Sequence, residues 1–369
     1  MIARSEPAPI VSASPDRVSD PVRMAVVGLG YWGPNLARNL QESTDADLVG
    51  LCDLSAERLE KHSRRYPAAT AYSSVERLLA DPSVEAVAIA TPVSTHHRLA
   101  SAALDAGKHV FVEKPLAASS GEAMALIEQA RRAGLVLMPG HTFLYSPPVR
   151  TIRSLIDSGE LGEIYFISTS RVNLGLHQAD ASVAWDLGPH DFSILRYWLG
   201  ETPTHASALS RCCIFPGTPD VAFINLEFPS GTIAHVELSW LAPSKLRRTA
   251  IIGSRKMVVY DDTSNEPVRV FDAGVMPNDP STFGEYQLTY RTGDIVSLRV
   301  DAVEPLAREL TDFSRAVRLG TVPVSSSHLG LEVVRMIEAV DASLDREGTR
   351  IELASTNGQR APNGAALSG

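Results

Sequence analysis

The chain has 369 residues, of which 44% are hydrophobic and 21% charged, which is the composition of an ordinary globular protein. A formal net charge of −9 argues against nucleic acid or an anionic membrane as a partner. No apolar run approaches the roughly 18 residues of a membrane helix, and three cysteines are too few for a disulfide framework or a zinc site. We therefore expect a cytoplasmic protein with reduced thiols.

The first predicted element follows a polar extension. Residues 1–21 contain Pro, Ser, Ala and Asp without an apolar core, so we expect them to be disordered and not a signal peptide. The apolar run Met24–Val27 then predicts a strand.

A glycine-rich turn, GLGYWG, follows this strand and precedes a predicted helix. Gly28 permits a tight turn, Gly30 lets the backbone approach a pyrophosphate, and Gly33 lets the helix pack closely on the strand. The helix N-terminus supplies an anion site. The pattern alone is weak evidence, because glycine turns occur in many connections between a strand and a helix.

The next strand, Ala46–Cys52, strengthens the prediction of a dinucleotide site. It ends at Asp53, 25 residues after Gly28, where a carboxylate accepts hydrogen bonds from the adenosine ribose hydroxyls. The same carboxylate repels a 2′-phosphate, and Leu54 follows it in place of an arginine. The sequence therefore predicts NAD, with NADP less favoured.

Helices and strands alternate from here to about His141, which predicts a doubly wound parallel sheet. Ligands of such a sheet lie outside the carboxyl ends of its strands. The expected helices are 55–66, 74–81, 94–106 and 119–133, and the expected strands are 69–72, 84–90, 109–112 and 135–138.

The pattern changes after residue 146. A helix is expected at 149–157, and two segments, 222–228 and 234–240, alternate apolar and polar residues around the turn at 229–231. This alternation predicts a mostly antiparallel sheet with one buried face. Further strands are expected at 164–173, 249–252, 256–260 and 295–300, and two amphipathic helices at 305–320 and after Ser326.

The segment Glu113-Lys114-Pro115 lies at the carboxyl end of a predicted strand, where a ligand is expected. A lysine is usually a solvated surface charge. Here Pro115 restricts the backbone at the mouth of the nucleotide crevice, which favours an ammonium group that binds and polarises a hydroxyl or carbonyl.

A second candidate segment contains Asp186 and His190, which share a helix face if a helix includes both. Histidine carries protons near neutral pH, and a carboxylate can orient it. A helix cap with local hydrogen bonds is an equally good interpretation of the spacing. Metal ligation is a weaker alternative, because no third or fourth ligand is evident.

Taken together and in this order, these motifs resemble those of the Gfo/Idh/MocA oxidoreductases, over about residues 22–350. The resemblance implies a Rossmann domain at 22–145 and a substrate-binding and oligomerisation α/β domain with a large, open, mostly antiparallel sheet at 146–350. It also implies a homodimer or homotetramer, and NAD(P)-dependent hydride transfer at a sugar or cyclitol carbinol. The composition of the remaining residues, 351–369, predicts a disordered tail.

The resemblance carries over to individual residues. It places Lys114 and His190 beside the substrate, with Asp186 as the supporting acid, and it implies that Thr91, Pro92 and His96 line the cofactor. His96 is equally well interpreted as a solvent-facing helix residue. Other candidates for the cofactor site are Glu113, Pro115, Tyr31 and Trp32, although one of the two aromatic rings can instead pack the helix onto the sheet.

Three polar residues are weaker candidates for substrate contacts. Arg171 and Asn173 lie at the end of a predicted strand and are expected to bond sugar hydroxyls together with Tyr145. Ordinary polarity at a sheet edge is the alternative.

We expect His190 to take the hydroxyl proton while Lys114 stabilises the alkoxide, although the two residues can exchange the role of base. The substrate is expected to be a sugar, a nucleotide-linked sugar or a cyclitol. Two rival functions remain: an NAD-dependent glycosidase that oxidises its substrate transiently, and a non-catalytic NAD-sensing regulator.

Overall fold

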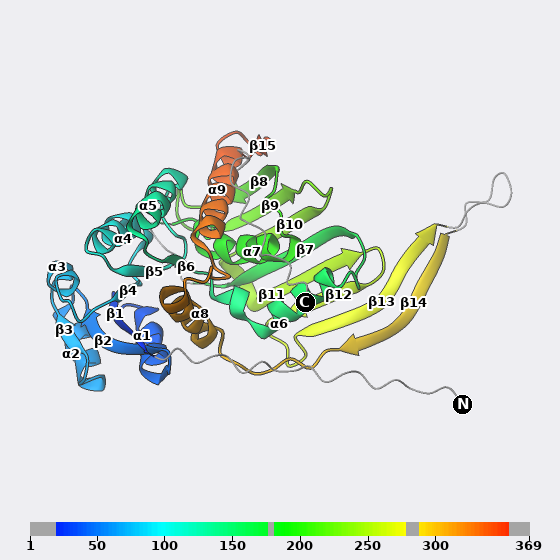
Figure 1. The fold of residues 1–369 in the computed structure, drawn as a ribbon. Coiled ribbons are helices and arrows are strands. Elements are labelled where there is room, and N and C mark those ends of the chain that lie inside the picture. The colour runs from blue at the N-terminus through cyan, green and yellow to red at the C-terminus, as the bar shows by residue number, and fades with distance from the viewer. Residues whose placement is uncertain (1–19, 176–180, 278–287, 354–369) are drawn as a thin grey trace, which may run out of the picture.

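The computed structural model describes residues 20–175, 181–277 and 288–353, which form two sheets with helices packed on them (Figure 1). The expectations for residues 1–19 and 354–369 lie outside the described residues. Within the described part of the chain, no helix combines the length and the apolar character needed to cross a membrane.

The first sheet has six strands within the described residues, all parallel, in the order β3-β2-β1-β4-β5-β6. The chain runs from β1 to one side and then returns to β4 on the other, so the carboxyl ends of β1 and β4 flank a crevice. The expected doubly wound sheet is confirmed. Its strands are β1 Val22–Val27, β2 Ala46–Cys52, β3 Thr70–Tyr72, β4 Ala86–Ile89, β5 His109–Glu113 and β6 Leu137–Gly140.

The helices of this half begin where the sequence predicts them. The side chains of Ser55, Ser74 and Ser119 each accept a hydrogen bond from a backbone amide in the first turn of the helix that follows. The helices are α1 Gly33–Glu42, α2 Ala56–Arg65, α3 Val75–Leu79, α4 His96–Asp105 after the short turn η1 Val93–Thr95, and α5 Ser120–Ala133.

The second sheet has nine strands within the described residues, in the order β14-β13-β12-β11-β7-β10-β9-β8-β15. Only β7 and β10 are parallel among its described pairs, so the expected mostly antiparallel sheet is confirmed. Its strands are β7 Ile164–Leu174, β8 His205–Arg211, β9 Val221–Glu227, β10 Ile233–Ser239, β11 Leu241–Gly253, β12 Met257–Asp261, β13 Val268–Pro277, β14 Leu288–Ser297 and β15 Ile351–Glu352.

The predicted hairpin of β9 and β10 is confirmed. Ala222 and Ile224 are buried, as are Ala234 and Val236 opposite them. The turn contains Gly231 at φ +89°, a conformation that glycine adopts without strain.

Four strands of this sheet differ from the prediction or were not predicted: β8, β13, β14 and β15. The strand expected at 295–300 instead ends at Ser297 and belongs to a long hairpin of β13 and β14 that extends away from the other elements (Figure 1). Strand β15 pairs with β8, so the expectation that the disordered tail begins at residue 351 is wrong. Strand β15 was missed because it is very short, and the bounds of β14 were missed because it mixes polar and apolar residues without a clear period.

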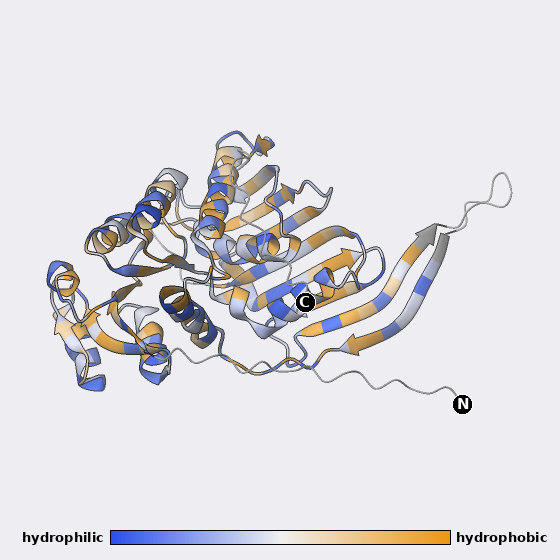
Figure 2. Cartoon of the chain, in the orientation of Figure 1, coloured by the Kyte–Doolittle hydropathy of each residue, from blue (hydrophilic) through white to orange (hydrophobic). Residues whose placement is uncertain are grey.

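Four helices complete this half: α6 Pro147–Asp157, α7 Val183–Leu199, α8 Pro305–Leu319 and α9 Ser327–Leu344. Before α6 lies the short turn η2 Thr142–Tyr145. The predicted apolar stripes of α8 and α9 are buried in the core. Figure 2 shows strands that are largely hydrophobic beside helices that carry both hydrophobic and hydrophilic positions, as expected for helices that cover a sheet with one face.

Helix α8 joins the two halves of the fold, because it packs against α1 and the first sheet. Phe313 of α8 contacts the ring of Phe111 on β5 edge to face, with ring centroids 5.9 Å apart.

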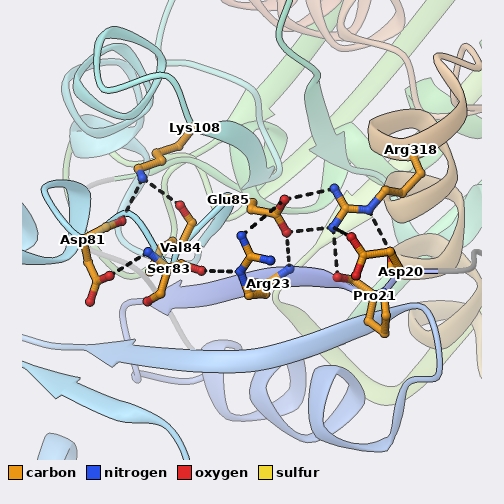
Figure 3. A network of polar contacts seen from close by, with 9 residues as sticks. All are labelled: Asp20, Pro21, Arg23, Asp81, Ser83, Val84, Glu85, Lys108 and Arg318. Atoms are coloured by element: carbon orange, nitrogen blue, oxygen red, sulfur yellow. Dashed lines mark hydrogen bonds and ion pairs between the residues drawn. The ribbon is translucent and has the colours of Figure 1, made fainter.

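A polar network fastens the end of this helix to the first sheet (Figure 3). Arg318 donates to Glu85 at 2.7 Å and to the backbone carbonyls of Asp20 and Pro21. Glu85 in turn accepts the backbone amide of Arg23 on β1.

Candidate active site

A cavity of about 1780 Å³ runs from the glycine turn of the first sheet to the start of α7. This volume exceeds the range of about 300–1,000 Å³ that is usual for a pocket holding one small molecule. It is therefore large enough for a dinucleotide together with a substrate.

The glycine turn has the geometry that a pyrophosphate requires. Gly28 has φ +93°, and a Cβ atom on Gly33 would lie 1.8 Å from the carbonyl oxygen of Gly28, so no larger residue fits there. A Cβ atom on Gly30 would meet only Nη1 of Arg58, at 3.6 Å, and would otherwise project into the cavity. The open side of the turn therefore fits a bound phosphate group.

Asp53 lies in the wall of this cavity at the carboxyl end of β2. Its carboxylate accepts the backbone amides of Leu29 at 2.6 Å and of Ser55 at 2.7 Å. These two bonds hold the carboxylate beside the glycine turn, where a ribose hydroxyl can also reach it.

The aromatic residues of the turn are placed differently from each other. Both residues line the cavity, but Tyr31 is 87% exposed whereas Trp32 also packs against the core, and the two rings stack 6.5 Å apart. The interpretation in which one ring packs the helix onto the sheet therefore fits Trp32.

Thr91 and Pro92 line the cavity, but His96 does not. His96 is buried, and its ring nitrogens bond the backbone carbonyls of Thr91 and Pro115. Its place is thus behind the cavity wall, where it ties together two segments of that wall, and the direct cofactor contact expected for it is not supported.

Lys114 and Asp186 come together although they are 72 residues apart in the chain. The Nζ atom of Lys114 lies 2.7 Å from the carbonyl oxygen of Asp186 and 3.3 Å from its Oδ1. The other carboxylate oxygen, Oδ2, accepts the indole N–H of Trp240 at 3.1 Å. The helix-cap interpretation is wrong for Asp186, because the cap of α7 is Ser182.

His190 lies one turn after Asp186 on α7 and also lines the cavity. Its ring packs edge to face on Phe143, with centroids 4.9 Å apart, and its Nδ1 has no hydrogen-bond partner among the described residues. Burial lowers the pKa of His190 well below its usual value, and the nearby charges of Lys114 and Arg171 add to the effect. The imidazole is therefore neutral at pH 7.

Two of the expected substrate contacts lie outside the cavity wall. Arg171 is buried in an ion pair with Asp191, and the hydroxyl of Tyr145 donates to Asp312. Their positions do not support a substrate role, whereas Asn173 does line the cavity.

The prediction from sequence named Glu113 as a candidate for the cofactor site but missed two buried polar residues near it, His141 and Glu309. Both ring nitrogens of His141, Oε1 of Glu113 and Oε1 of Glu309 lack partners among the described residues. Burial raises the pKa of Glu113 to about 7 and that of Glu309 well above its usual value, and lowers that of His141 to about 3. One feature of the sequence could have revealed Glu309: it is an acidic residue three positions after Leu306, within the apolar stripe of α8.

Comparison with known proteins identifies two family domains. Residues 22–141 match the model described as "Oxidoreductase family, NAD-binding Rossmann fold", and residues 149–259 match the GFO/IDH/MocA C-terminal domain.

Similar curated proteins include a scyllo-inositol 2-dehydrogenase (NAD(+)) of Bacillus subtilis, 29% identical over 92% of this chain and 94% of the relative. A D-xylose 1-dehydrogenase (NADP(+)) of Haloferax volcanii is 30% identical over 77% of this chain and 85% of the relative. Among solved structures, the UDP-N-acetylglucosamine 3-dehydrogenase of Acidithiobacillus ferrooxidans has a TM-score of 0.75 at 26% identity, over 89% of this chain and 98% of that one. The glycine turn, Asp53 and the two matched domains together show that the chain belongs to the Gfo/Idh/MocA family of NAD-binding oxidoreductases.

Proposed function

We propose that this oxidoreductase reversibly oxidises a secondary alcohol of a sugar, a nucleotide-linked sugar or a cyclitol, with Lys114 and His190 at the reacting oxygen. The bound nicotinamide supplies hydride acceptance and donation. The observation that carries the proposal is that Lys114, Asp186 and His190 line the same cavity as the glycine turn and Asp53.

Lys114, Asp186 and His190 have different roles in this reaction. The ammonium of Lys114 binds and polarises the substrate oxygen, while Asp186 holds that ammonium in place through the 3.3 Å contact. His190, which is neutral at pH 7, accepts the hydroxyl proton. The phenyl ring of Phe143 keeps the imidazole oriented.

We assign residues 22–145 to the cofactor and residues 146–350 to the substrate and to self-association. The two matched family domains, at residues 22–141 and 149–259, support this division. The relatives are described as acting on an inositol, a pentose and a UDP-linked amino sugar. All three substrates carry a CH–OH group, which is the shared chemistry that the proposal uses.

We also propose that the chain forms a homodimer or homotetramer through the face of the second sheet that faces away from the buried core. Leu209, Phe223 and Ile233 are exposed large hydrophobic residues on β8, β9 and β10. Leu209 pairs directly with Phe223, and Ile233 pairs with Phe166, so the exposed apolar residues share one face. An apolar face of this kind marks an interaction site.

The test is a panel of free sugars, nucleotide-linked sugars and cyclitols, each with NAD+ and with NADP+, read as formation of the reduced cofactor. At least one compound should be oxidised, with NAD+ preferred. On that compound, Lys114→Met should lower kcat/KM by at least a hundredfold, the order expected for loss of an electrostatic contact in the transition state. Lys245→Met, at an exposed lysine outside the cavity wall, is the matched control. Turnover by Lys114→Met within a few fold of wild type would show that the assignment is wrong.

A further inference from the structure

Two carboxyl groups lie close to the nicotinamide half of the cavity without an evident role in the reaction. Glu113 ends β5, on the side of the switch point opposite Asp53, so it lies where a dinucleotide bound at Asp53 places its second nucleotide. Glu309 reaches the same region from α8, is fully buried, and accepts the hydroxyl of Thr142 at 2.6 Å.

The groups around Glu113 leave its charge without a dedicated partner. The next residue in the chain, Lys114, donates its backbone amide to Glu113 at 3.3 Å, and its ammonium, which also contacts Asp186, lowers the pKa of Glu113 through its charge. The indole of Trp32 faces Glu113 from the turn before α1, and Glu309 faces it from α8, where the charge of Glu113 adds to burial in raising the pKa of Glu309.

The histidines near this site are neutral at pH 7. His141 follows Gly140, the residue that pairs with Glu113 in the sheet, and burial keeps its imidazole uncharged. His190 is uncharged for the same reason. The carboxylate of Asp186 already pairs with the ammonium of Lys114. The carboxylate of Glu113 is therefore the most direct counter-charge for a positively charged ring that enters the cavity.

We propose that Glu113 is a proton-coupled counter-ion of the nicotinamide: it gives up its proton when the positively charged oxidised cofactor binds, and its protonation does not change when the neutral reduced cofactor binds. Glu309 stays protonated in both states. The inference rests on the cofactor site and needs no substrate, so it can be tested even if the proposed substrate class is wrong.

The proposal fixes the direction of a pH effect. Burial raises the pKa of Glu113 to about 7 in the free enzyme, so at pH 6 most molecules must lose a proton before the oxidised cofactor gains its counter-ion. The affinity for NAD+ should therefore be about tenfold weaker at pH 6 than at pH 8. The affinity for NADH should change by less than about twofold over the same range.

Proton release is the direct measurement. Isothermal titration calorimetry of the full chain with NAD+ at pH 6.5, in two buffers of different ionisation enthalpy, should show release of more than half a proton for each NAD+ bound, because a group with a pKa of about 7 is mostly protonated there. Titration with NADH should show almost none.

Three variants identify the group. Glu113→Gln should abolish proton release and flatten the pH dependence of NAD+ binding. Glu309→Gln should leave both unchanged, because this carboxyl stays protonated. Glu163→Gln, at an exposed position at the start of the second sheet, is the matched control and should behave as wild type.

Several results would overturn the proposal: no proton release by the wild type, equal release with NAD+ and NADH, or loss of release in Glu309→Gln with retention in Glu113→Gln. If Glu113→Gln does not bind NAD+, infrared difference spectra of the wild type and of Glu309→Gln decide. The carbonyl band of a protonated carboxylic acid should be weaker with NAD+ than with NADH in both proteins, and an unchanged band contradicts the proposal.

Discussion

The ammonium of Lys114 depends on Asp186 for its position, and Asp186 depends on Trp240 for its own. The carboxylate uses one oxygen for the ammonium and the other for the indole N–H, so its orientation is determined from both sides. Preorganisation of this kind matters because a small misplacement of a catalytic group has a large effect on rate.

Replacing Asp186 with Asn should therefore lower kcat by about tenfold to a hundredfold, because the amide removes the charge that holds the ammonium. The Kd of NAD+, measured by calorimetry, should change by less than about twofold, and this split between binding and turnover distinguishes a positioning residue from one needed for folding. Asp47→Asn, at an exposed position on β2, is the control. Unchanged turnover in Asp186→Asn would contradict the role.

Sequence patterns located the residues of this site that follow a recognisable element, and they failed for residues whose role depends on packing. Lys114 and Asp53 both follow a buried strand in the first sheet, so topology alone places them at the cavity. A polar residue near the end of a strand carries no such information: Asn173 faces the cavity, whereas Arg171, two residues earlier, is buried against Asp191. Only coordinates distinguish these two outcomes.

At the scale of elements, the connection from β1 to α1 is the most constrained segment of the fold. A methyl group at Gly33 would overlap the carbonyl oxygen of Gly28, whereas a methyl group at Gly121, in α5, meets only Ser119 Oγ at 3.9 Å. The two glycines therefore form a matched pair: a methyl group does not fit at Gly33, and it fits at Gly121.

Gly33→Ala should lower the melting temperature markedly, with a loss of about 2–4 kcal/mol, because backbone must move to accept the methyl group. Gly121→Ala should leave stability unchanged or raise it by up to about 1 kcal/mol, since alanine is the better helix former. Thermal unfolding followed by circular dichroism measures both. Equal melting temperatures for the two variants would contradict the close approach seen here.

Elements with a strong period were predictable, and elements that depend on a distant partner were not. The buried strands of the first sheet and the apolar stripes of α8 and α9 carry their periodicity in the sequence. Helix α7 could be anticipated only conditionally, because Pro189 lies inside it and normally argues for a helix end. Strand β15 exists only through its pairing with β8, which no local pattern reveals.

At the scale of the whole molecule, the ion pair of Arg318 and Glu85 joins chain segments 233 residues apart. Arg318→Ala should reduce the free energy of unfolding at pH 7 by about 1–2 kcal/mol, because it removes a partly buried charged hydrogen bond. Arg315→Ala is the control, since Arg315 makes no ion pair within the described part of the chain. NAD+ affinity should be unaffected in both.

The effect of Arg318→Ala should also depend on pH. Its hydrogen bond lowers the pKa of Glu85 below the ordinary value of 4.5, so the pair stabilises the fold above that pH and loses its effect as pH falls through the lowered value. The difference in stability between wild type and Arg318→Ala should shrink as the pH is lowered below 4.5. If the difference in stability persists in strong acid, it arises from packing of the Arg318 side chain and not from the ion pair.

The proposed self-association through the second sheet can be tested by charge. The double variant Phe223→Glu, Ile233→Glu places two carboxylates on the apolar face and should convert the oligomer to a monomer, as measured by light scattering after size-exclusion chromatography. Val322→Glu, at an exposed position after α8, should keep the mass of the wild type. A double variant that keeps this mass would contradict the proposed interface.

The packing of Phe313 on Phe111 has a consequence for how the protein is made. The ribosome releases residues 22–145 first, but the helix that covers Phe111 belongs to residues 305–319. Translation proceeds at about 5–20 residues per second, so α8 is synthesised on the order of 10–30 s after the nucleotide-binding half. During this time the ring of Phe111 lacks its contact with Phe313. In a fragment that stops at residue 145, Phe111 would never gain this contact. The nucleotide-binding half therefore depends on the C-terminal half to complete its packing.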